Sequence, residues 1–317
     1  MFEEIIGQAL PKKILSNAIS ENRVNHAYIF YGKEGTGRLT VAKKFSQYLI
    51  CKNKTACMEC SSCKQFLANT VDDFKIVEPE AGKENILVEQ IRELTNDVYI
   101  RPHIFNKKIY IIKDADKMNQ NAQNAFLKVF EEPPDYAVFI LIVSQISSIL
   151  PTIKSRGVEV RFSNLNREDM KEIFRRNFNK ELPDDIAAVS DGSIKTALGL
   201  LENNDFSEIR ESILNLLPSF INSKSEADMM NLYKCISENK DNAQMIMNII
   251  YTVLTDIINT GKPDLIKIYD YGTKLPEKKI YSIFSVLEEL SKRLTTKASY
   301  NIMVLDALKK IRKILII

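Results

Sequence analysis

The sequence of 317 residues lacks a large net charge and a long apolar run, and it has only two histidines. A formal net charge of +3 excludes a strong basic field over the whole chain, of the kind that attracts DNA nonspecifically. No stretch approaches the roughly 20 apolar residues of a membrane-spanning helix, so no membrane partner is expected. The acidic residues 1–4 do not begin a secretory signal, which predicts a cytoplasmic protein. His26 and His103 have no ligand or base partner in the sequence and are assigned no role.

A phosphate-binding loop at residues 31–40 lacks its working residues. The Walker A pattern is Gly, four residues, Gly, Lys and then Ser or Thr, between a strand and a helix. An apolar strand-like run precedes this loop and a helical pattern follows it. The glycine frame is kept by Gly32, Gly35 and Gly37. Arg38 replaces the lysine, Leu39 replaces the hydroxyl that would hold Mg²⁺, and Thr40 offers a hydroxyl one position late.

The second half of a nucleotide site is also altered. A Walker B strand ends in an Asp that supports Mg²⁺, but here Lys113 and Asp114 follow the apolar run at 109–112. A lysine at that point opposes Mg²⁺ binding, so hydrolysis by this chain alone is not expected. Nucleotide binding without hydrolysis stays open, because the glycine frame could cradle phosphates through backbone N–H groups. A rival hypothesis is a working ATPase in which Arg38 binds phosphate and Thr40 and Asp114 hold the metal.

Four of the five cysteines crowd into one short segment. They are Cys51, Cys57, Cys60 and Cys63. In a chain without an export signal this spacing favours a metal over disulfides, and four thiolates suit tetrahedral Zn²⁺. An iron–sulfur cluster is the minor rival. Because the set leaves no open position and has no histidine nearby, we interpret it as a structural zinc insert at residues 51–63.

Periodicity along the chain predicts an α/β portion followed by helices. From 1 to 163, apolar strands at 73–77, 137–143 and 158–162 alternate with helical patterns at 88–98 and 121–132, which predicts a parallel sheet covered on both faces. A small helical unit is expected at 164–204. An all-helical domain is expected at 205–317. Its helices are predicted to break at Pro218, 261–263, Gly272 and Pro276.

Several segments together resemble a bacterial clamp-loader subunit of the AAA+ class. The segments are the start Phe-Glu-Glu-Ile-Ile-Gly-Gln at 2–8, the loop at 32–40, the cysteine segment at 51–63, the run Leu-Lys-x-x-Glu-Glu-Pro-Pro at 127–134 and Ser155-Arg156-Gly157. The resemblance implies an AAA+ domain over 1–163, a helical lid over 164–204 and an oligomerising collar over 205–317. It also implies motor (gamma/tau) and delta subunits as partners, with the sliding clamp and primed DNA reached through the complex.

Within that family the chain resembles delta-prime subunits more than the motor. A motor would carry Lys and Thr at 38 and 39, Asp-Glu at 113 and 114, and Arg at the position of Lys195. The resemblance therefore implies a non-hydrolysing part of the DNA polymerase III holoenzyme, the stator against which the motor subunits move. It also implies that Arg156, after Ser155, is an arginine finger for the ATP of a neighbouring subunit, although Gly157 replaces the family's cysteine.

A third hypothesis is a zinc-dependent module that binds nucleic acid. Lys52, Lys54 and Lys64 lie near the cysteines and could contact phosphates. No aromatic stacking pattern accompanies these lysines. Zinc chelation distinguishes the hypotheses, since loss of DNA binding with assembly intact would favour this third one.

Overall fold

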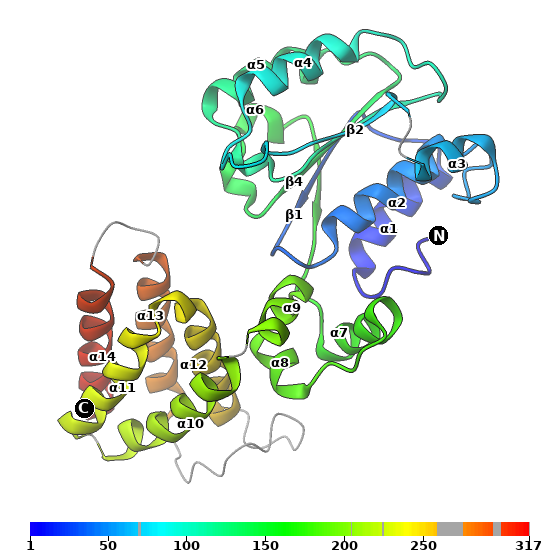
Figure 1. Ribbon diagram of the computed structural model, residues 1–317. Helices are drawn as coiled ribbons and strands as arrows, with labels where there is room; N and C mark the ends of the chain where they lie inside the picture. Colours follow the sequence, from blue (N-terminus) through cyan, green and yellow to red (C-terminus); the bar gives the residue numbers. More distant parts are fainter. Residues whose placement is uncertain (69–70, 204, 224, 259–274, 294–298, 317) are drawn as a thin grey trace. The chain divides into compact units, whose positions relative to one another are not determined.

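The computed structural model describes residues 1–317 except 69–70, 204, 224, 259–274, 294–298 and 317 (Figure 1). The chain divides into two compact units, Met1–Asn177 and Phe178–Ile317. None of the described helices combines the length and apolar character that crossing a bilayer requires. The three-domain division expected from the sequence stays a prediction.

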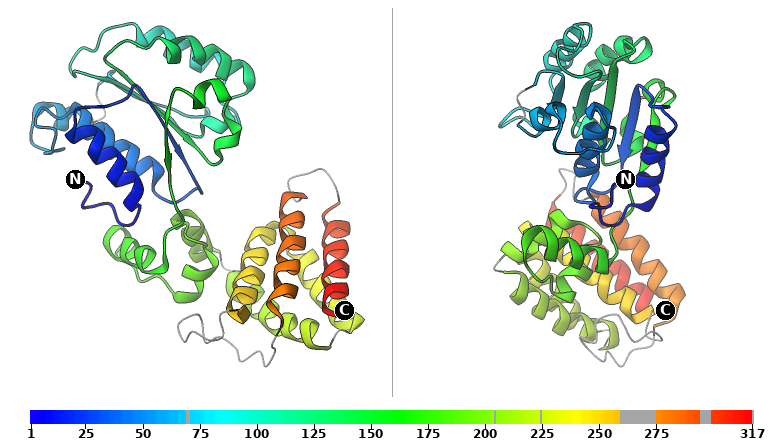
Figure 2. Two further views of the ribbon diagram at one scale, coloured as in Figure 1. Left: turned by 180° about the vertical axis from the view of Figure 1, so that it is seen from behind. Right: turned by 90° about the vertical axis from the view of Figure 1, so that its right-hand side faces the viewer.

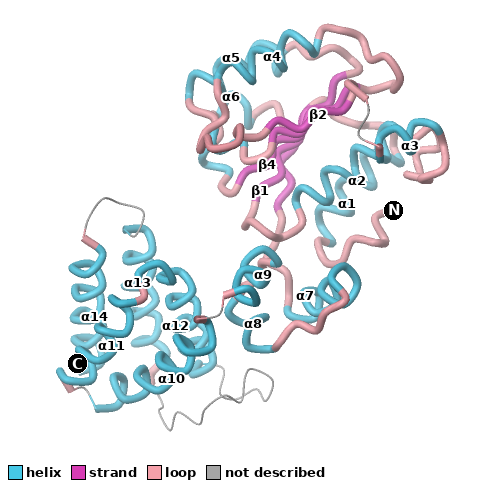
Figure 3. The backbone as a smooth tube through the Cα atoms, in the orientation of Figure 1, coloured by secondary structure: helices cyan, strands magenta, loops and turns pink. Residues whose placement is uncertain are grey.

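The first unit is built on a parallel sheet of five strands (Figure 3). The strands are β1 (Ala27–Tyr31), β2 (Phe74–Val77), β3 (Lys108–Ile112), β4 (Ala137–Val143) and β5 (Val158–Arg161). Their order is β2-β3-β4-β1-β5, and every pairing is parallel. Because β1 pairs with β4, Tyr31 lies opposite Val143, and the carboxyl ends of these two strands meet at one edge of the sheet.

Helices cover both faces of this sheet, as the sequence predicts. Helices α1 (Ala9–Ser20) and α2 (Arg38–Ile50) lie on one face, and α4 (Val88–Val98), α5 (Gln120–Glu131) and α6 (Pro151–Lys154) lie on the other (Figures 1 and 2). Side chains alternate between the two cores: Tyr28 and Phe30 pack beneath α1 and α2, whereas Ile29 packs beneath α5. Parallel strands buried on both faces explain the continuous apolar runs in the sequence.

The first unit also contains the short α-helices α3 and α7. Helix α3 (Ser61–Leu67) packs against α2 and carries the end of the cysteine segment, a helix that sequence patterning did not predict. Helix α7 (Arg167–Ile173) begins after Asn166, whose side chain accepts the Asp169 N–H at 2.7 Å and so caps the helix.

The described part of the second unit is helical throughout. Its helices are α8 (Asp184–Val189), α9 (Ile194–Glu202), α10 (Phe206–Ser223), α11 (Glu226–Glu238), α12 (Ala243–Ile258), α13 (Glu277–Arg293) and α14 (Tyr300–Ile316). Helix α11 packs against α10 and α14, and α13 packs against α12 and α14. The lid and collar roles expected for these helices stay predictions.

One predicted helix break is wrong. Pro218 lies inside α10, where its ring removes one backbone hydrogen bond. Leu214, Leu217 and Phe220 on the same helix are buried, and their packing offsets this loss. The predicted break at Pro276 is confirmed, since α13 begins at Glu277. The predicted breaks at 261–263 and Gly272 lie outside the described residues.

Candidate functional site

The phosphate loop keeps its shape between β1 and α2. Gly32, Gly35 and Gly37 all have positive φ angles, of 144°, 80° and 92°. A Cβ atom on Gly32 would lie 2.4 Å from the Phe162 carbonyl oxygen, so no side chain fits there. The loop lies at the carboxyl ends of the strands, where open α/β sheets bind ligands. The sequence-predicted frame of a phosphate site is therefore present.

The Arg38 side chain bonds to the sheet of its own chain. It is 5% exposed, and its Nη1 donates to the carbonyl oxygen of Val143 at the end of β4. The same oxygen accepts the Gly32 N–H at 3.3 Å, so Arg38 ties the loop to the sheet edge. Burial lowers the pKa of Arg38, and the nearby carboxylates of Asp116, Glu34 and Asp114 oppose that shift.

The side chains of Leu39 and Thr40, the two residues after Arg38, have different surroundings. Leu39 is partly buried and packs against the core beneath α1 and α2. Thr40 is exposed on the first turn of α2. The position that would hold a metal-binding hydroxyl in a Walker A loop is thus occupied by a side chain that contributes to packing.

At the end of β3, side chains of the chain itself surround the altered Walker B position. Lys113 Nζ lies 2.6 Å from Glu78 Oε2, and this hydrogen bond raises the pKa of Lys113 against the effect of burial. Asp114 Oδ2 lies 3.5 Å from Lys117 Nζ. The ion pair between Lys113 and Glu78 therefore joins the ends of β3 and β2. It lies in the region where a metal ion would need free carboxylates.

Gln8 is a residue of this site whose role sequence reasoning missed. It is 8% exposed, and its Nε2 donates to the carbonyl oxygens of Thr36 (3.1 Å) and Ser163 (2.7 Å). Its Oε1 accepts the Ser163 N–H at 3.1 Å. One amide thereby joins the N-terminal segment, the phosphate loop and the chain leaving β5. The only signal in the sequence was the place of Gln8 at the end of the 2–8 motif.

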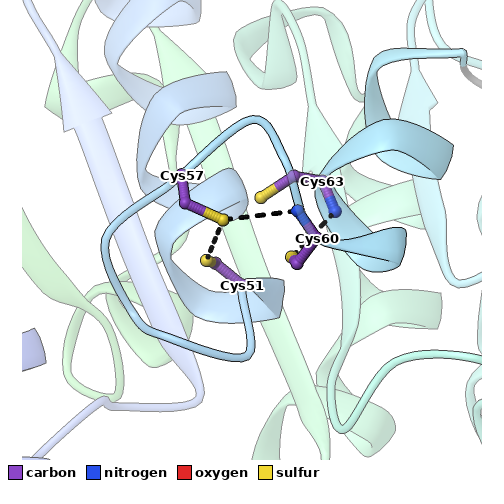
Figure 4. A group of neighbouring side chains, drawn as sticks. All are labelled: Cys51, Cys57, Cys60 and Cys63. Atoms are coloured by element: carbon purple, nitrogen blue, oxygen red, sulfur yellow. Dashed lines mark hydrogen bonds between the residues drawn. The ribbon is translucent and has the colours of Figure 1, made fainter.

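The four predicted cysteines come together in space (Figure 4). All their Sγ atoms lie within 4.8 Å of one another, and those of Cys51 and Cys57 are 3.7 Å apart. Tetrahedral zinc with Zn–S bonds near 2.3 Å requires sulfur atoms about 3.8 Å apart, so the set fits a metal ion. The Cys60 and Cys63 N–H groups donate to Cys57 Sγ and Cys60 Sγ, both at 3.5 Å, as suits thiolates.

Burial, backbone N–H groups and neighbouring sulfur atoms set how readily each thiol ionises. Burial opposes ionisation of Cys51, but backbone N–H groups of Cys57, Thr55 and Asn53 lower its pKa to about 6. Burial and the neighbouring Cys60 and Cys51 sulfurs raise the pKa of Cys63 to about 12. The first thiolates to form therefore repel negative charge on the remaining sulfur atoms. A cation bound among the four sulfur atoms would relieve this repulsion. The four cysteines could bind a metal ion.

Arg156 lies at the end of α6 and makes three contacts within its own chain. Its Nη2 is 3.1 Å from Glu131 Oε1 at the end of α5. Its Nη1 donates to the Thr152 carbonyl oxygen at 2.9 Å and to Ser155 Oγ at 3.2 Å. The Arg156 side chain remains 39% exposed. A permanently charged, forked donor is therefore held at the surface.

Gly157 follows this arginine for a steric reason. A Cβ atom there would lie 2.9 Å from both Cγ1 and Cδ1 of Ile29, a buried residue of β1. The turn between α6 and β5 thus passes close to the sheet, and the glycine allows that approach. The glycine after Arg156 therefore has a local packing explanation.

Comparison with known proteins relates these features to a family. The family model described as "DNA polymerase III, delta subunit" matches residues 7–166, just over half of the chain. The chain is 30% identical over 241 residues to a DNA polymerase III subunit gamma from Buchnera aphidicola, covering 73% of this chain and 63% of that protein.

Two similar proteins are DNA polymerase III subunits delta'. The one from Pseudomonas aeruginosa is 29% identical over 297 residues, covering 89% of this chain and 90% of that protein. The one from Bacillus subtilis is 26% identical over 253 residues, covering 78% and 76%. The chain thus spans less than two thirds of the gamma relative but most of each delta' relative.

Proposed function

Because the chain belongs to the DNA polymerase III delta-subunit family of clamp-loader subunits, we propose that it is a delta-prime-type subunit that does not hydrolyse ATP itself. It assembles with motor (gamma/tau) and delta subunits through its helical collar, 205–317. The complex opens a sliding clamp and loads it on primed DNA during replication. This chain serves as the stator of that assembly.

The observation that carries the proposal is that the side chains of Arg38 and Lys113, in the degenerate nucleotide site, are bound by partners within this chain. Arg38 is buried against Val143, and Lys113 is paired with Glu78. Phosphoryl transfer depends on positioning and on charge stabilisation around Mg²⁺. With Leu39 packed against the core and Lys113 at the Walker B position, this chain would form no such metal centre.

The cysteine insert supports the proposal as a structural element. Cys51, Cys57, Cys60 and Cys63 would hold one Zn²⁺, which would supply folding energy to a segment of little apolar core. Backbone N–H donors to the sulfurs orient the thiolates for that role. The insert takes no part in nucleotide chemistry.

Arg156 is the group through which this chain would act on a neighbour. It is exposed, and its planar guanidinium is shaped to match phosphate oxygens bidentately. A finger supplied in trans contributes about 10³–10⁵ in rate at the site that it serves. Ser155 would orient it, since Ser155 Oγ accepts from Nη1.

The test is Arg156→Ala in the loader reconstituted from all its subunits, with clamp and primed DNA. ATP turnover and clamp loading should fall while the subunits still co-purify. Arg176→Ala is the matched control, since Arg176 is also exposed and ion-paired with a glutamate, Glu172. Unchanged turnover in Arg156→Ala would refute the finger, and metal-dependent turnover by the isolated chain would favour an active ATPase.

A further inference from the structure

The arginine proposed as a finger already holds an anion of its own chain. Glu131 Oε1 lies 3.1 Å from Arg156 Nη2. The other acceptors of Arg156, the Thr152 carbonyl oxygen and Ser155 Oγ, belong to its own helical turn and move with it. Glu131 is the last residue of α5, a separate element that contacts α6. The carboxylate is therefore the one described contact that restrains the guanidinium from outside its turn.

Both members of this pair are open to solvent. The Glu131 side chain is 44% exposed and that of Arg156 is 39% exposed. Exposed ion pairs are weak, so the carboxylate can be exchanged for another anion without disturbing the core. A guanidinium binds carboxylate and phosphate oxygens with the same planar fork. A polyphosphate that approaches from a neighbouring subunit thus competes with Glu131 for the same donors.

We propose that Glu131 is an intrachain competitor that holds Arg156 beside α5 until the nucleotide polyphosphate of a neighbouring subunit replaces the carboxylate. The inference rests on the proposed function of Arg156 and adds a positioning residue to it. A triphosphate carries more negative charge than a diphosphate and displaces Glu131 more completely. After the terminal phosphate is lost, the arginine returns to Glu131, and the contact between subunits weakens.

The chain provides a matched control at the next position. Glu132 is also an exposed glutamate at the end of α5, and it forms no ion pair with any residue that the structure describes. Glu131→Gln and Glu132→Gln remove the same charge from adjacent positions. Only the first removes the counter-ion of Arg156, so the comparison separates this contact from a general change in surface charge.

The experiment measures ATP dependence of turnover in the complete reconstituted loader. We expect Glu131→Gln to lower the ATP concentration for half-maximal turnover by about twofold to fivefold, the range of one exposed ion pair. Glu132→Gln should match the wild type in this measurement. In an Arg156→Ala background, Glu131→Gln should have no further effect. The melting temperature of each variant should equal that of its parent.

Two outcomes would overturn the competitor role. One is an ATP dependence of Glu131→Gln equal to that of Glu132→Gln. The other is a loss of maximal turnover in Glu131→Gln, which would mean that Glu131 assists the finger instead of competing for it. Either result leaves the finger itself intact if Arg156→Ala still lowers turnover. If Arg156→Ala changes nothing, the proposed function fails first.

Discussion

Replacing Arg38 with the lysine of a Walker A loop should lower the free energy of unfolding of this protein. In Arg38→Lys the ammonium keeps the charge but loses the planar fork that reaches the Val143 carbonyl at the end of β4. A hydrogen bond to a charged group contributes about 1.5–3 kcal/mol, and a buried lysine recovers part of it. The lysine side chain also leaves the space of the guanidinium unfilled. Because Arg38 is only 5% exposed, this costs packing contacts in the interior. We expect unfolding free energy to fall by about 1.5–2.5 kcal/mol.

For the unit Met1–Asn177 this loss corresponds to a melting temperature lower by roughly 3–10 °C. The assay is thermal and urea unfolding of the full chain, with and without ATP and Mg²⁺. Arg176→Lys is the control, because Arg176 is exposed and should tolerate the same change.

One result would refute this reasoning. If Arg38→Lys is as stable as the wild type, the buried guanidinium contributes nothing to the stability of the loop. The same assay answers a separate question, because a higher melting temperature of the wild type with ATP would mean that this chain binds nucleotide, which its sequence leaves open. At 100 times its Kd a ligand adds about 2.7 kcal/mol, an effect that this assay would readily detect.

Two further predictions concern the metal and pH. The purified chain should carry about one zinc ion. Cys60→Ser should lose this ion, and its cysteine insert should become sensitive to protease. Metal analysis that finds equal zinc in the two proteins would contradict this prediction. Burial opposes ionisation of Asp97, but hydrogen bonds from Tyr110, Lys108 and Lys75 hold its pKa below the ordinary value. The ionised Asp97 therefore stabilises the folded state fully at pH values above its pKa in the unfolded chain. This contribution is lost as the pH falls through its lowered pKa in the folded chain. Asp97→Asn should therefore show a smaller difference in urea midpoint between pH 7 and pH 3 than the wild type, and equal differences would argue against it.

Much of the sheet could be predicted because its inner strands, β1, β3 and β4, are buried on both faces. The runs at 137–143 and 88–98 coincide with β4 and α4, since continuous apolar character and 3.6-residue periodicity are local signals. Helix α10 differs, because the local cost of Pro218 is smaller than the gain from packing that joins distant helices. Helix α3 was missed because seven residues among the cysteines carry too short a periodic pattern.

By itself the sequence determined which residues of the Walker motifs are replaced and which side chains could bind a metal ion. Arg38, Leu39 and Lys113 break both Walker motifs, and the spacing of four cysteines indicates a metal, because each conclusion depends on residue identity over a few positions.

Only the tertiary structure decided what took the place of the missing groups. Arg38 bonds to a carbonyl 105 positions away, and Lys113 pairs with a glutamate 35 positions away. These partners become neighbours because the strand order sets β1 beside β4 and β2 beside β3. The Glu131–Arg156 contact likewise depends on the packing of α5 against α6. No local pattern encodes such pairs, since strand pairing and helix packing depend on burial summed over the whole unit.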